Sequence, residues 1–433
     1  MNKMYMSLLV SSLVLASEAD LQKQLDELRS EMKELKIEQS QTNESLVEEL
    51  VSIKNEMFMP ASESESFSSL GVAASKVYHT KSVVSIGGYG EYKLKKYTEF
   101  KNGGSDNANK RRKKIETNVV RFVPYIGFRF NDWIVMNTEI EFEDGGAKTQ
   151  DDGNDYKYAI IEFSYIDFMF SKEASLRVGH VLVPFGNINL NHEPVAYLTA
   201  ERPTVETIII PSTWHTNGAL LFGQIDDFEY YIGTVSAPDA SDYKEGTFIQ
   251  QGRRGAKQTT NDFGIVARAQ YDFGSGLVAG TSFYHSNTGG DLDYVGIDAN
   301  VAVTMAEVHA TYKNNDWEIS ALAVFGDMGD YDKIPGVELS SKVYGAYVTA
   351  GYNVLRSSTQ RLLPYVEIEH LNMDANDDTT LPDNHKFNEY TAGFAYYPDP
   401  HVVVKLDYWI KDYNADATLA DEEAVTASLG FIF

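Results

Sequence analysis

From residue 82 to the C-terminus, apolar and polar positions alternate along the chain with a period of two. Residues 263–273 show this pattern well: the odd positions from Phe263 to Phe273 are all apolar, and those between them are mostly polar or small. Successive side chains of a β-strand point to opposite faces of the sheet. The pattern therefore predicts a strand of about ten residues with one apolar and one polar face.

The same alternation recurs in other segments of comparable length. Sixteen strands are predicted, with boundaries good to a few residues. They span 83–98, 118–130, 133–143, 156–170, 175–183, 217–225, 228–235, 262–273, 277–286, 303–313, 317–326, 342–354, 362–372, 388–397, 401–412 and 423–433. An even number of antiparallel two-faced strands is the rule for bacterial transmembrane barrels.

The connections between these segments alternate between short and long without a break. Tight turns such as Asn131-Asp132 and Asp226-Asp227 are followed by long polar connections, the longest of which is 184–216. A soluble β-sandwich or propeller would not sort its loops so regularly by length. The chain also ends on Phe433, with Phe431 and Leu429 on the same face, which resembles the C-terminal signature of outer-membrane barrels. We therefore predict an all-β fold, a 16-stranded antiparallel transmembrane β-barrel over 82–433, preceded by an α-helical coiled coil.

The first 19 residues follow a different rule. A single basic residue, Lys3, precedes a short apolar stretch and then small residues up to Ala19. This order is typical of a secretory signal peptide, with cleavage after Ala16 or Ala19. The alternative, a membrane anchor, is disfavoured because the apolar run is shorter than the roughly 20 residues that a bilayer requires.

Residues 20–57 carry an apolar seam at heptad spacing. The seam runs through Leu21, Leu25, Leu28, Met32 and Leu35. It is polar at Gln39 and Thr42 and resumes, after a one-residue slip, with Leu46, Leu50, Ile53 and Met57. Such a stripe predicts a coiled coil, since it is buried only against another helix. The alternative is a single amphipathic helix lying on its own domain. Residues 58–81, rich in Ser and Glu over 62–69, are predicted to be a linker.

Composition narrows the classes of function. The chain has 433 residues and a formal net charge of −26, with 63 acidic against 37 basic residues and no cysteine. The acidic balance argues against nucleic acid as a partner, because phosphate neutralisation requires clustered Lys and Arg. The lack of cysteine excludes disulfides, thiolate metal sites and cysteine nucleophiles.

Charged residues inside the predicted strands fall on the parity opposite to the apolar face. This placement is expected for a lumen, since a lipid-facing Lys or Arg at mid-membrane costs about 2–4 kcal/mol, and sixteen strands leave an aqueous channel. The pore-lining candidates are Lys93, Lys95, Arg121, Arg129, Glu139, Glu141, Arg177, Arg268, Glu367, Glu369 and Lys405. His180 and His370 fall instead on the lipid parity, which indicates interface positions, a bulge or an error of register.

The long connection 184–216 lacks a strand pattern and begins with Pro184-Phe-Gly. Long connections of this kind usually have a functional reason. We expect it to fold into the barrel and narrow the channel, bringing Glu193, Glu201, Arg202 and Glu206 near the permeant ion. The alternative is an outward surface loop.

A coiled coil ahead of a sixteen-strand barrel, together with the stretch from Leu176 to Gly186 (LRVGHVLVPFG), resembles the phosphate-selective porin O and P family. In that family a similar segment leads into the loop that folds into the pore. The resemblance implies a homotrimer, a periplasmic coiled coil and a diffusion channel that prefers anions in some members. The positions of this chain that could form an anion-attracting lining are Arg121, Arg129, Arg177, Arg202 and Arg268. The net charge and the lumenal glutamates depart from such a lining.

These observations predict a porin that passes small hydrophilic or ionic solutes by passive diffusion, with anions such as phosphate as candidates. The alternative is a barrel that acts mainly as an envelope tether or spacer through its coiled coil. No catalytic constellation, cofactor or metal site is predicted, so the protein is not expected to be an enzyme. The expected partners are two further copies in a homotrimer, outer-membrane lipid and lipopolysaccharide, and the solutes. The expected location is the outer membrane of a Gram-negative bacterium, with the coiled coil in the periplasm.

Overall fold

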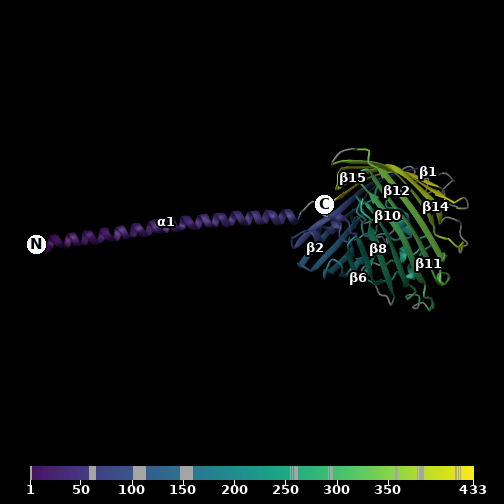
Figure 1. Cartoon of the computed structure of the whole chain (residues 1–433), viewed down its shortest axis with the longest axis horizontal. Helices are drawn as coiled ribbons and strands as arrows, with labels where there is room; N and C mark the ends of the chain where they lie inside the picture. The colour runs from purple at the N-terminus through teal and green to yellow at the C-terminus, as the bar shows by residue number, and fades with distance from the viewer. Residues whose placement is uncertain are drawn as a thin grey trace. The chain divides into compact units, whose positions relative to one another are not determined.

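The computed structural model describes residues 2–57, 65–100, 114–146, 159–253, 262–290, 296–355, 359–377, 385–414 and 421–433, together with 255, 257, 292, 379, 417 and 419. The chain divides into two compact units, Met1–Met57 and Phe58–Phe433. The first is helical and the second is a β-barrel (Figure 1). None of the described helices combines the length and hydropathy that a membrane-crossing helix needs.

The first unit is one continuous helix, α1, from Asn2 to Met57. Its central residues are rich in Glu, Lys, Gln and Leu, which are strong helix formers. The seam residues Leu25, Leu28, Met32 and Leu35 are all exposed. The helix is thus present, whereas pairing into a coiled coil stays a prediction. The predicted signal peptide lies within the same helix, and its removal also stays a prediction.

The second unit is a closed antiparallel barrel of sixteen strands, counted over the described residues. Each strand pairs with its neighbours in sequence, and β1 pairs with β16 to close the ring. The strands are β1 (Val84–Phe100), β2 (Glu116–Asn131), β3 (Ile134–Glu143), β4 (Ala159–Phe168), β5 (Ser175–Leu182), β6 (His215–Ile225), β7 (Phe228–Ser236), β8 (Phe263–Asp272), β9 (Leu277–Asn287), β10 (Ala302–Lys313), β11 (Trp317–Met328), β12 (Lys342–Tyr352), β13 (Arg361–Asn372), β14 (Lys386–Asp399), β15 (Val402–Tyr413) and β16 (Glu422–Ile432). The predicted number, order and approximate bounds of the strands are confirmed.

Among the described strands, closure leaves no edge without a partner strand. The backbone N–H groups of Gly88 and Phe433 each donate to the other residue's carbonyl, at 2.9 Å, so the final residue joins the ring. In a closed sheet the backbone N–H and C=O groups of every strand bond to a neighbouring strand. A hydrocarbon environment requires this, because it offers no other hydrogen-bonding partner.

The two faces of the barrel differ as the alternation predicts. In β13, Val366 and Ile368 are 55% and 51% exposed, whereas Glu367 and Glu369 are each 3% exposed. The outer face is therefore apolar, and the charged residues of this strand point inward. His180 and His370 do lie on the outer parity, where each meets an asparagine of the next strand, Asn217 and Asn388 respectively.

Part of the predicted linker is ordered inside the barrel. Residues Val72–His79 form helix α2, which packs against β1, β2 and β3 with Ala73, Ala74 and Val77 buried. Arg129 of β2 donates from Nη2 to the carbonyls of Val77 and Tyr78, at 2.9 and 3.2 Å. These bonds satisfy carbonyls at the C-terminal end of the helix, which have no partner within it. Of the residues predicted as a linker, Val72–His79 thus form a buried helix that packs on the barrel.

Candidate functional site

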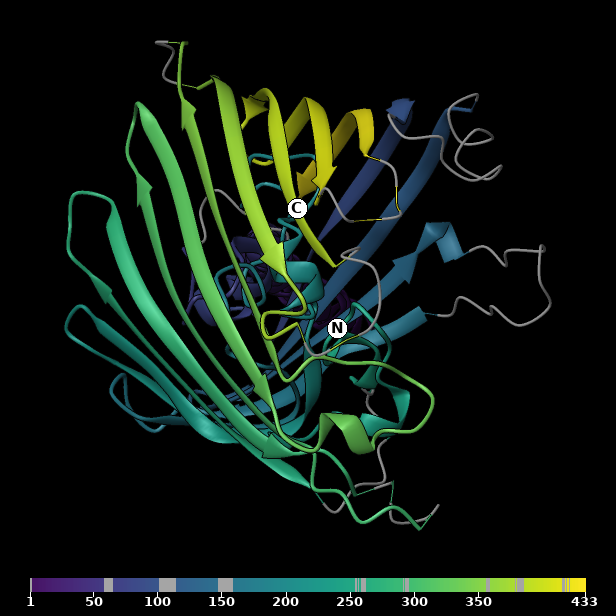
Figure 2. The ribbon, with the colours of Figure 1, turned by 90° about the vertical axis from the view of Figure 1, so that its right-hand side faces the viewer.

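The connection between β5 and β6, residues 183–214 and hereafter the inner loop, lies inside the barrel. Figure 2 shows the loop within the ring of strands. Its residues bond to strands all around the ring, which is possible only from the interior of a closed sheet. These contacts join His192 to β3, Thr213 to β4, Gly186 to β8, Asn187 to β11, Glu206 to β12, Thr204 to β13 and β14, Ala200 to β15 and Glu201 to β1.

One attachment of the inner loop is built on Glu206, in the short helix α4 (Val205–Ile208). Its Oε2 accepts the backbone N–H groups of Asn187 and Ile188, both at 2.8 Å. Its Oε1 accepts the hydroxyl of Tyr347 from β12 at 2.6 Å. Burial raises the pKa of Glu206 to about 7, against the opposing effect of these donors. The carboxylate thus joins two stretches of the loop, residues 187–188 and helix α4, to each other and to the barrel strands (hereafter the wall).

The wall contributes a second carboxylate to the same attachment. Glu369 of β13 accepts the backbone N–H groups of Thr204 and Val205 at 3.0 and 2.9 Å. Glu389 of β14 accepts the Thr204 hydroxyl at 2.7 Å. All of these carboxylate oxygens have donors, and hydrogen bonds to ionised acceptors are about twice as strong as neutral ones.

Glu201 and Arg202 connect the inner loop to β1 and to the loop itself. Glu201 forms ion pairs with two lysines of β1: its Oε1 lies 3.5 Å from Lys93 Nζ and 3.2 Å from Lys95 Nζ. Burial acts to raise the pKa of Glu201, but the two lysines outweigh it and hold the pKa below its usual value. Arg202 donates to the His192 carbonyl at 3.3 Å.

Several basic residues predicted to line the channel are occupied in holding internal structure. Arg177 is fully buried, with two bonds of 2.9 Å to Asp167, and its guanidinium stacks 3.9 Å from the centroid of the Tyr165 ring. Arg129 caps helix α2, as described above. The ordered segment 65–81 occupies that side of the lumen. Neither guanidinium is therefore accessible to an ion in the lumen.

The other basic candidates also have partners. Arg121 pairs with Glu141 at 3.4 Å and with Glu91 at 3.6 Å. Lys405 donates to the Thr199 carbonyl at 2.8 Å, and Arg268 donates to the Gly186 carbonyl. These side chains point inward as the parity predicts, but most of them bind the inner loop.

Open space remains beside the inner loop. One cavity has a volume of about 690 Å³ and a smaller one about 40 Å³. Of the predicted site residues, the larger is lined by Glu193, Arg268 and Glu367, and the smaller by Lys95, Glu201, Arg202, Glu367 and Glu369. Both signs of charge therefore border the open lumen.

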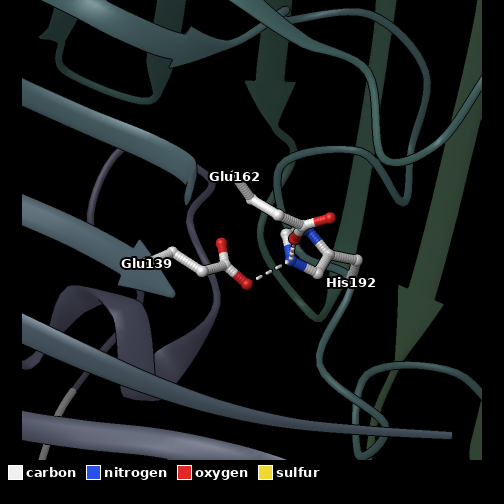
Figure 3. Close-up of side chains that lie close together, drawn as sticks. All are labelled: Glu139, Glu162 and His192. Carbon is white, nitrogen blue, oxygen red and sulfur yellow. Dashed lines mark hydrogen bonds and ion pairs between the residues drawn. The ribbon is translucent and has the colours of Figure 1, made fainter. Parts of the chain in front are cut away.

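Another attachment of the inner loop is a cluster of Glu139 from β3, Glu162 from β4 and His192, hereafter the Glu–Glu–His cluster (Figure 3). Nε2 of His192 lies 3.2 Å from Glu139 Oε1 and 3.5 Å from Glu162 Oε2. Thr213, at the end of the loop, donates its hydroxyl to Glu162 Oε1. Burial lowers the pKa of His192 to about 4.

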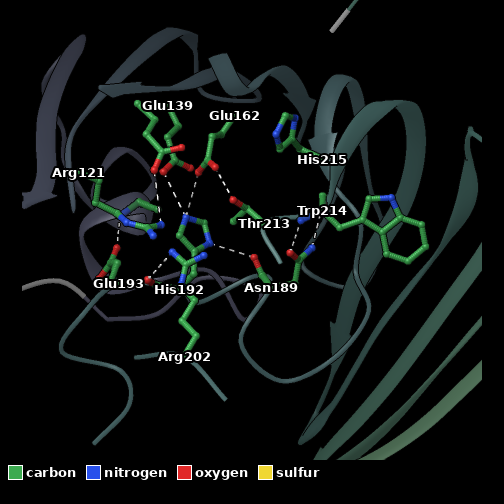
Figure 4. A network of polar contacts seen from close by, with 12 residues as sticks. Arg121, Glu139, Glu162, Asn189, His192, Glu193, Arg202, Thr213, Trp214 and His215 are labelled. Atoms are coloured by element: carbon green, nitrogen blue, oxygen red, sulfur yellow. Dashed lines mark hydrogen bonds and ion pairs between the residues drawn. The ribbon is translucent and has the colours of Figure 1, made fainter. Parts of the chain in front are cut away.

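Neighbouring residues enclose this cluster (Figure 4). Glu193 accepts the backbone N–H of Ala74 in α2 at 3.0 Å, and burial raises the pKa of Glu193 to about 7. Asn189 fixes the loop from within by donating to the carbonyls of Val183 and Trp214, at 2.7 and 2.9 Å. The inner loop thus bridges helix α2 and the wall.

The sequence pattern identified Glu139 but missed Glu162 and His192. The β3–β4 register shifts beside Glu139, which pairs with Phe163, while Ile140 pairs with Ile161. Glu162 is the extra residue of this bulge, so both it and Phe163 are buried. A strict period of two places only one of them inside. His192 has no pattern around it, and only the inward path of the loop brings it to the wall.

Comparisons with known proteins place the fold. No family model matches the chain. A protein of Aquifex aeolicus (strain VF5) described only as uncharacterized is 28% identical over 369 residues, 80% of each chain. Among solved structures, the outer membrane channel DcaP of Acinetobacter baumannii has a TM-score of 0.54 at 13% identity, covering 81% of this chain and 97% of that one.

Two further solved structures are similar. Salmonella typhi OmpF in complex with daunomycin has a TM-score of 0.53 at 14% identity, over 81% of this chain and 97% of OmpF. An anion-selective porin from Comamonas acidovorans has a TM-score of 0.51 at 13% identity, over 81% and 99% of the two chains. At such identities the likeness establishes the fold: this chain has the barrel of outer-membrane porins.

Proposed function

We propose that the protein is an outer-membrane channel through which small hydrophilic or ionic solutes diffuse passively, and that it has no enzymatic role. The observation that carries this proposal is the cavity of about 690 Å³ beside the inner loop, within a closed barrel and lined by charged residues such as Arg268, Arg361 and Glu367. Single-channel conductance in a planar bilayer is the test. Absence of channels from correctly folded protein would overturn the proposal.

The inner loop sets the size limit of this channel. It crosses the lumen and bonds to strands on all sides, so solutes must pass beside it. Replacing 188–210 with a short Gly-Ser linker is expected to raise conductance and the size limit for neutral sugars. Unchanged conductance in a folded barrel would refute the constriction.

Charge preference is expected to be weak, with anions such as phosphate as candidates rather than as dedicated substrates. Lys93 and Lys95 share Glu201, and Arg121 is held between Glu91 and Glu141. Paired charges attract a passing ion less than free ones, because their fields partly cancel. The zero-current potential under a salt gradient measures the preference, and block of the current by added phosphate would identify a phosphate site.

We also propose a homotrimer, with β3–β6 facing the neighbouring copies. Thr138, Ser164, His180 and Asn217 lie opposite one another across these four strands, and Thr138 and Ser164 bond at 3.0 Å. They share the outer face, where polar groups are unfavourable against lipid. Replacing both His180 and Asn217 with Leu is expected to weaken the trimer, measured by light scattering in detergent. An unchanged oligomer would place this face against lipid.

The helix α1 supports a second candidate function, an envelope tether or spacer. Its leucine seam is exposed, so a coiled coil in the periplasm would cover it. Deleting 20–57 from the exported protein distinguishes the two roles. Conductance retained with a weakened envelope would favour the tether, whereas an intact envelope would favour the channel alone.

A further inference from the structure

We propose that the Glu–Glu–His cluster binds one divalent cation that accepts mixed imidazole and carboxylate ligands, with Zn²⁺ as the representative ion. Glu139, Glu162 and His192 each offer one ligand atom, and these atoms all lie within 4.8 Å of one another. Two ligands belong to adjacent strands and the third to the inner loop (Figure 3). The ion would therefore fasten the loop to the wall.

The hydrogen-bond pattern of His192 leaves one nitrogen directed at the carboxylates. Nδ1 lies 3.0 Å from the Asn189 carbonyl, which can only accept, so the proton belongs on Nδ1. Metal-binding histidines usually donate their other N–H to a carbonyl or carboxylate in this way. In the neutral imidazole Nε2 then carries a lone pair, and it faces two carboxyl groups that, when ionised, can only accept.

Each of the two carboxylates lacks part of the donor set that Glu206 and Glu369 have. Glu139 Oε2 and Glu162 Oε2 are buried without a hydrogen-bond partner, and the two residues are 0% and 1% exposed. Among the described residues, no lysine or arginine forms an ion pair with either carboxylate; Arg121 is engaged with Glu91 and Glu141. Unpaired buried charge costs several kcal/mol in proteins, and a bound cation removes that cost.

The distances fit a tetrahedral ion better than a large oxygen-liganded one. Zn²⁺ binds His nitrogen and Glu oxygen at about 2.0–2.2 Å, so ligand atoms of a tetrahedral site lie about 3.3–3.6 Å apart. The two distances from Nε2 are 3.2 and 3.5 Å. Ca²⁺ and Mg²⁺ prefer oxygen ligands alone, whereas imidazole together with carboxylate suits Zn²⁺ and its first-row neighbours.

The direct test is metal binding by the full-length barrel. The protein is refolded into detergent after chelator treatment, with or without Zn²⁺, and bound zinc is counted by mass spectrometry after gel filtration. One zinc per chain is expected, with Ca²⁺ and Mg²⁺ unable to displace it at equal concentration. No retained zinc in the wild type would overturn the proposal. Co²⁺ in place of Zn²⁺ should give the intense visible absorption of a four-coordinate site, and an octahedral spectrum would contradict it.

Matched variants test whether the zinc is bound by the Glu–Glu–His cluster. Glu162→Gln and His192→Gln should each lower zinc affinity at least tenfold, since the loss even of an outer partner costs 10–100-fold. The control is His385→Asn, which removes a more exposed His–Glu pair, in which His385 Nε2 lies 2.8 Å from Glu245 Oε1. It should leave the stoichiometry unchanged. Equal retention by all variants would mean adventitious binding and would refute the site.

A second readout concerns the loop and rests on the proposed channel function. If zinc fastens the inner loop, its addition should reduce gating noise and protect the loop from protease in the wild type but not in His192→Gln. Zinc bound without any change in the protease pattern would refute the fastening role. The zinc count does not depend on conduction, so failure of the channel function and failure of the metal site are distinguishable.

Discussion

Two of the attachments of the inner loop, the one built on Glu206 and the Glu–Glu–His cluster, use the same residue type with opposite local chemistry. At the β12–β14 side, Glu206 and Glu369 receive donors from backbone N–H groups and from Tyr347. At the β3–β4 side, Glu139 and Glu162 each keep one buried oxygen without a partner. The comparison teaches that burial alone does not make a glutamate an anchor. A carboxyl group whose two oxygens both have donors holds the loop through those bonds, whereas one with an unpartnered buried oxygen leaves room for a further ligand.

The largest expected effect comes from breaking the satisfied attachment. Glu206→Ala leaves Asn187 N–H, Ile188 N–H and the Tyr347 hydroxyl without their acceptor. We expect a loss of about 3–5 kcal/mol in the free energy of unfolding, because each lost bond to a charged group costs about 1.5–3 kcal/mol before relaxation. Urea titration of the refolded barrel measures it. A loss below about 1 kcal/mol would mean that the carboxylate does not anchor the loop.

The pH dependence of the free energy of unfolding tests the role of Glu206 in the same attachment. Burial raises the pKa of Glu206 to about 7 and that of Glu193 to about 7. Between the ordinary glutamate pKa and pH 7 the folded state holds more protons than the unfolded state, so stability falls as pH rises. Glu206→Gln should flatten part of this fall, seen by comparing unfolding at pH 5 and pH 8. The same slope in the variant would exclude Glu206 as its source.

A neutral hydrogen bond at the Glu206 attachment should contribute less to the free energy of unfolding than the bonds to the carboxylate. Asn187 donates from Nδ2 to Ser320 Oγ at 2.9 Å and toward the Tyr347 hydroxyl at 3.4 Å. Asn187→Ala is expected to cost about 1 kcal/mol, the usual net worth of a neutral hydrogen bond. The urea midpoint measures the change. An effect as large as that of Glu206→Ala would remove the distinction between charged and neutral contacts.

The smallest effect is expected at the unsatisfied attachment in metal-free protein. Glu162→Gln preserves an acceptor for Thr213 and removes a buried charge that lacks a full set of donors. The free energy of unfolding should change by less than about 1 kcal/mol, in either direction. A loss comparable to that of Glu206→Ala, measured with chelator present, would mean that the carboxylate is already stabilised without a cation.

The sequence predicts the barrel well because an apolar outer face and a polar inner face impose the period of two on every strand. It locates inward charges such as Glu367 and Lys405 for the same reason. The interior is harder to predict, since its contacts join residues far apart in the chain. Arg177 has the right parity, yet its partners Asp167 and Tyr78 leave it no access to solvent. Helix α2 is short and follows a serine-rich stretch, so its burial has no periodic signal.

The junction between Gly88 and Phe433 has a consequence for the order of folding. It joins residues 345 positions apart, and the entropy lost on closing a loop grows with its length. Contacts of long sequence separation also form slowly. Helix α2 lies directly before β1 in the chain and already touches Glu193 inside the ring. The pairing of β1 with β16 is therefore the long-range step of the fold, and a chain that lacks β16 would leave β1 and β15 each with an unpaired edge.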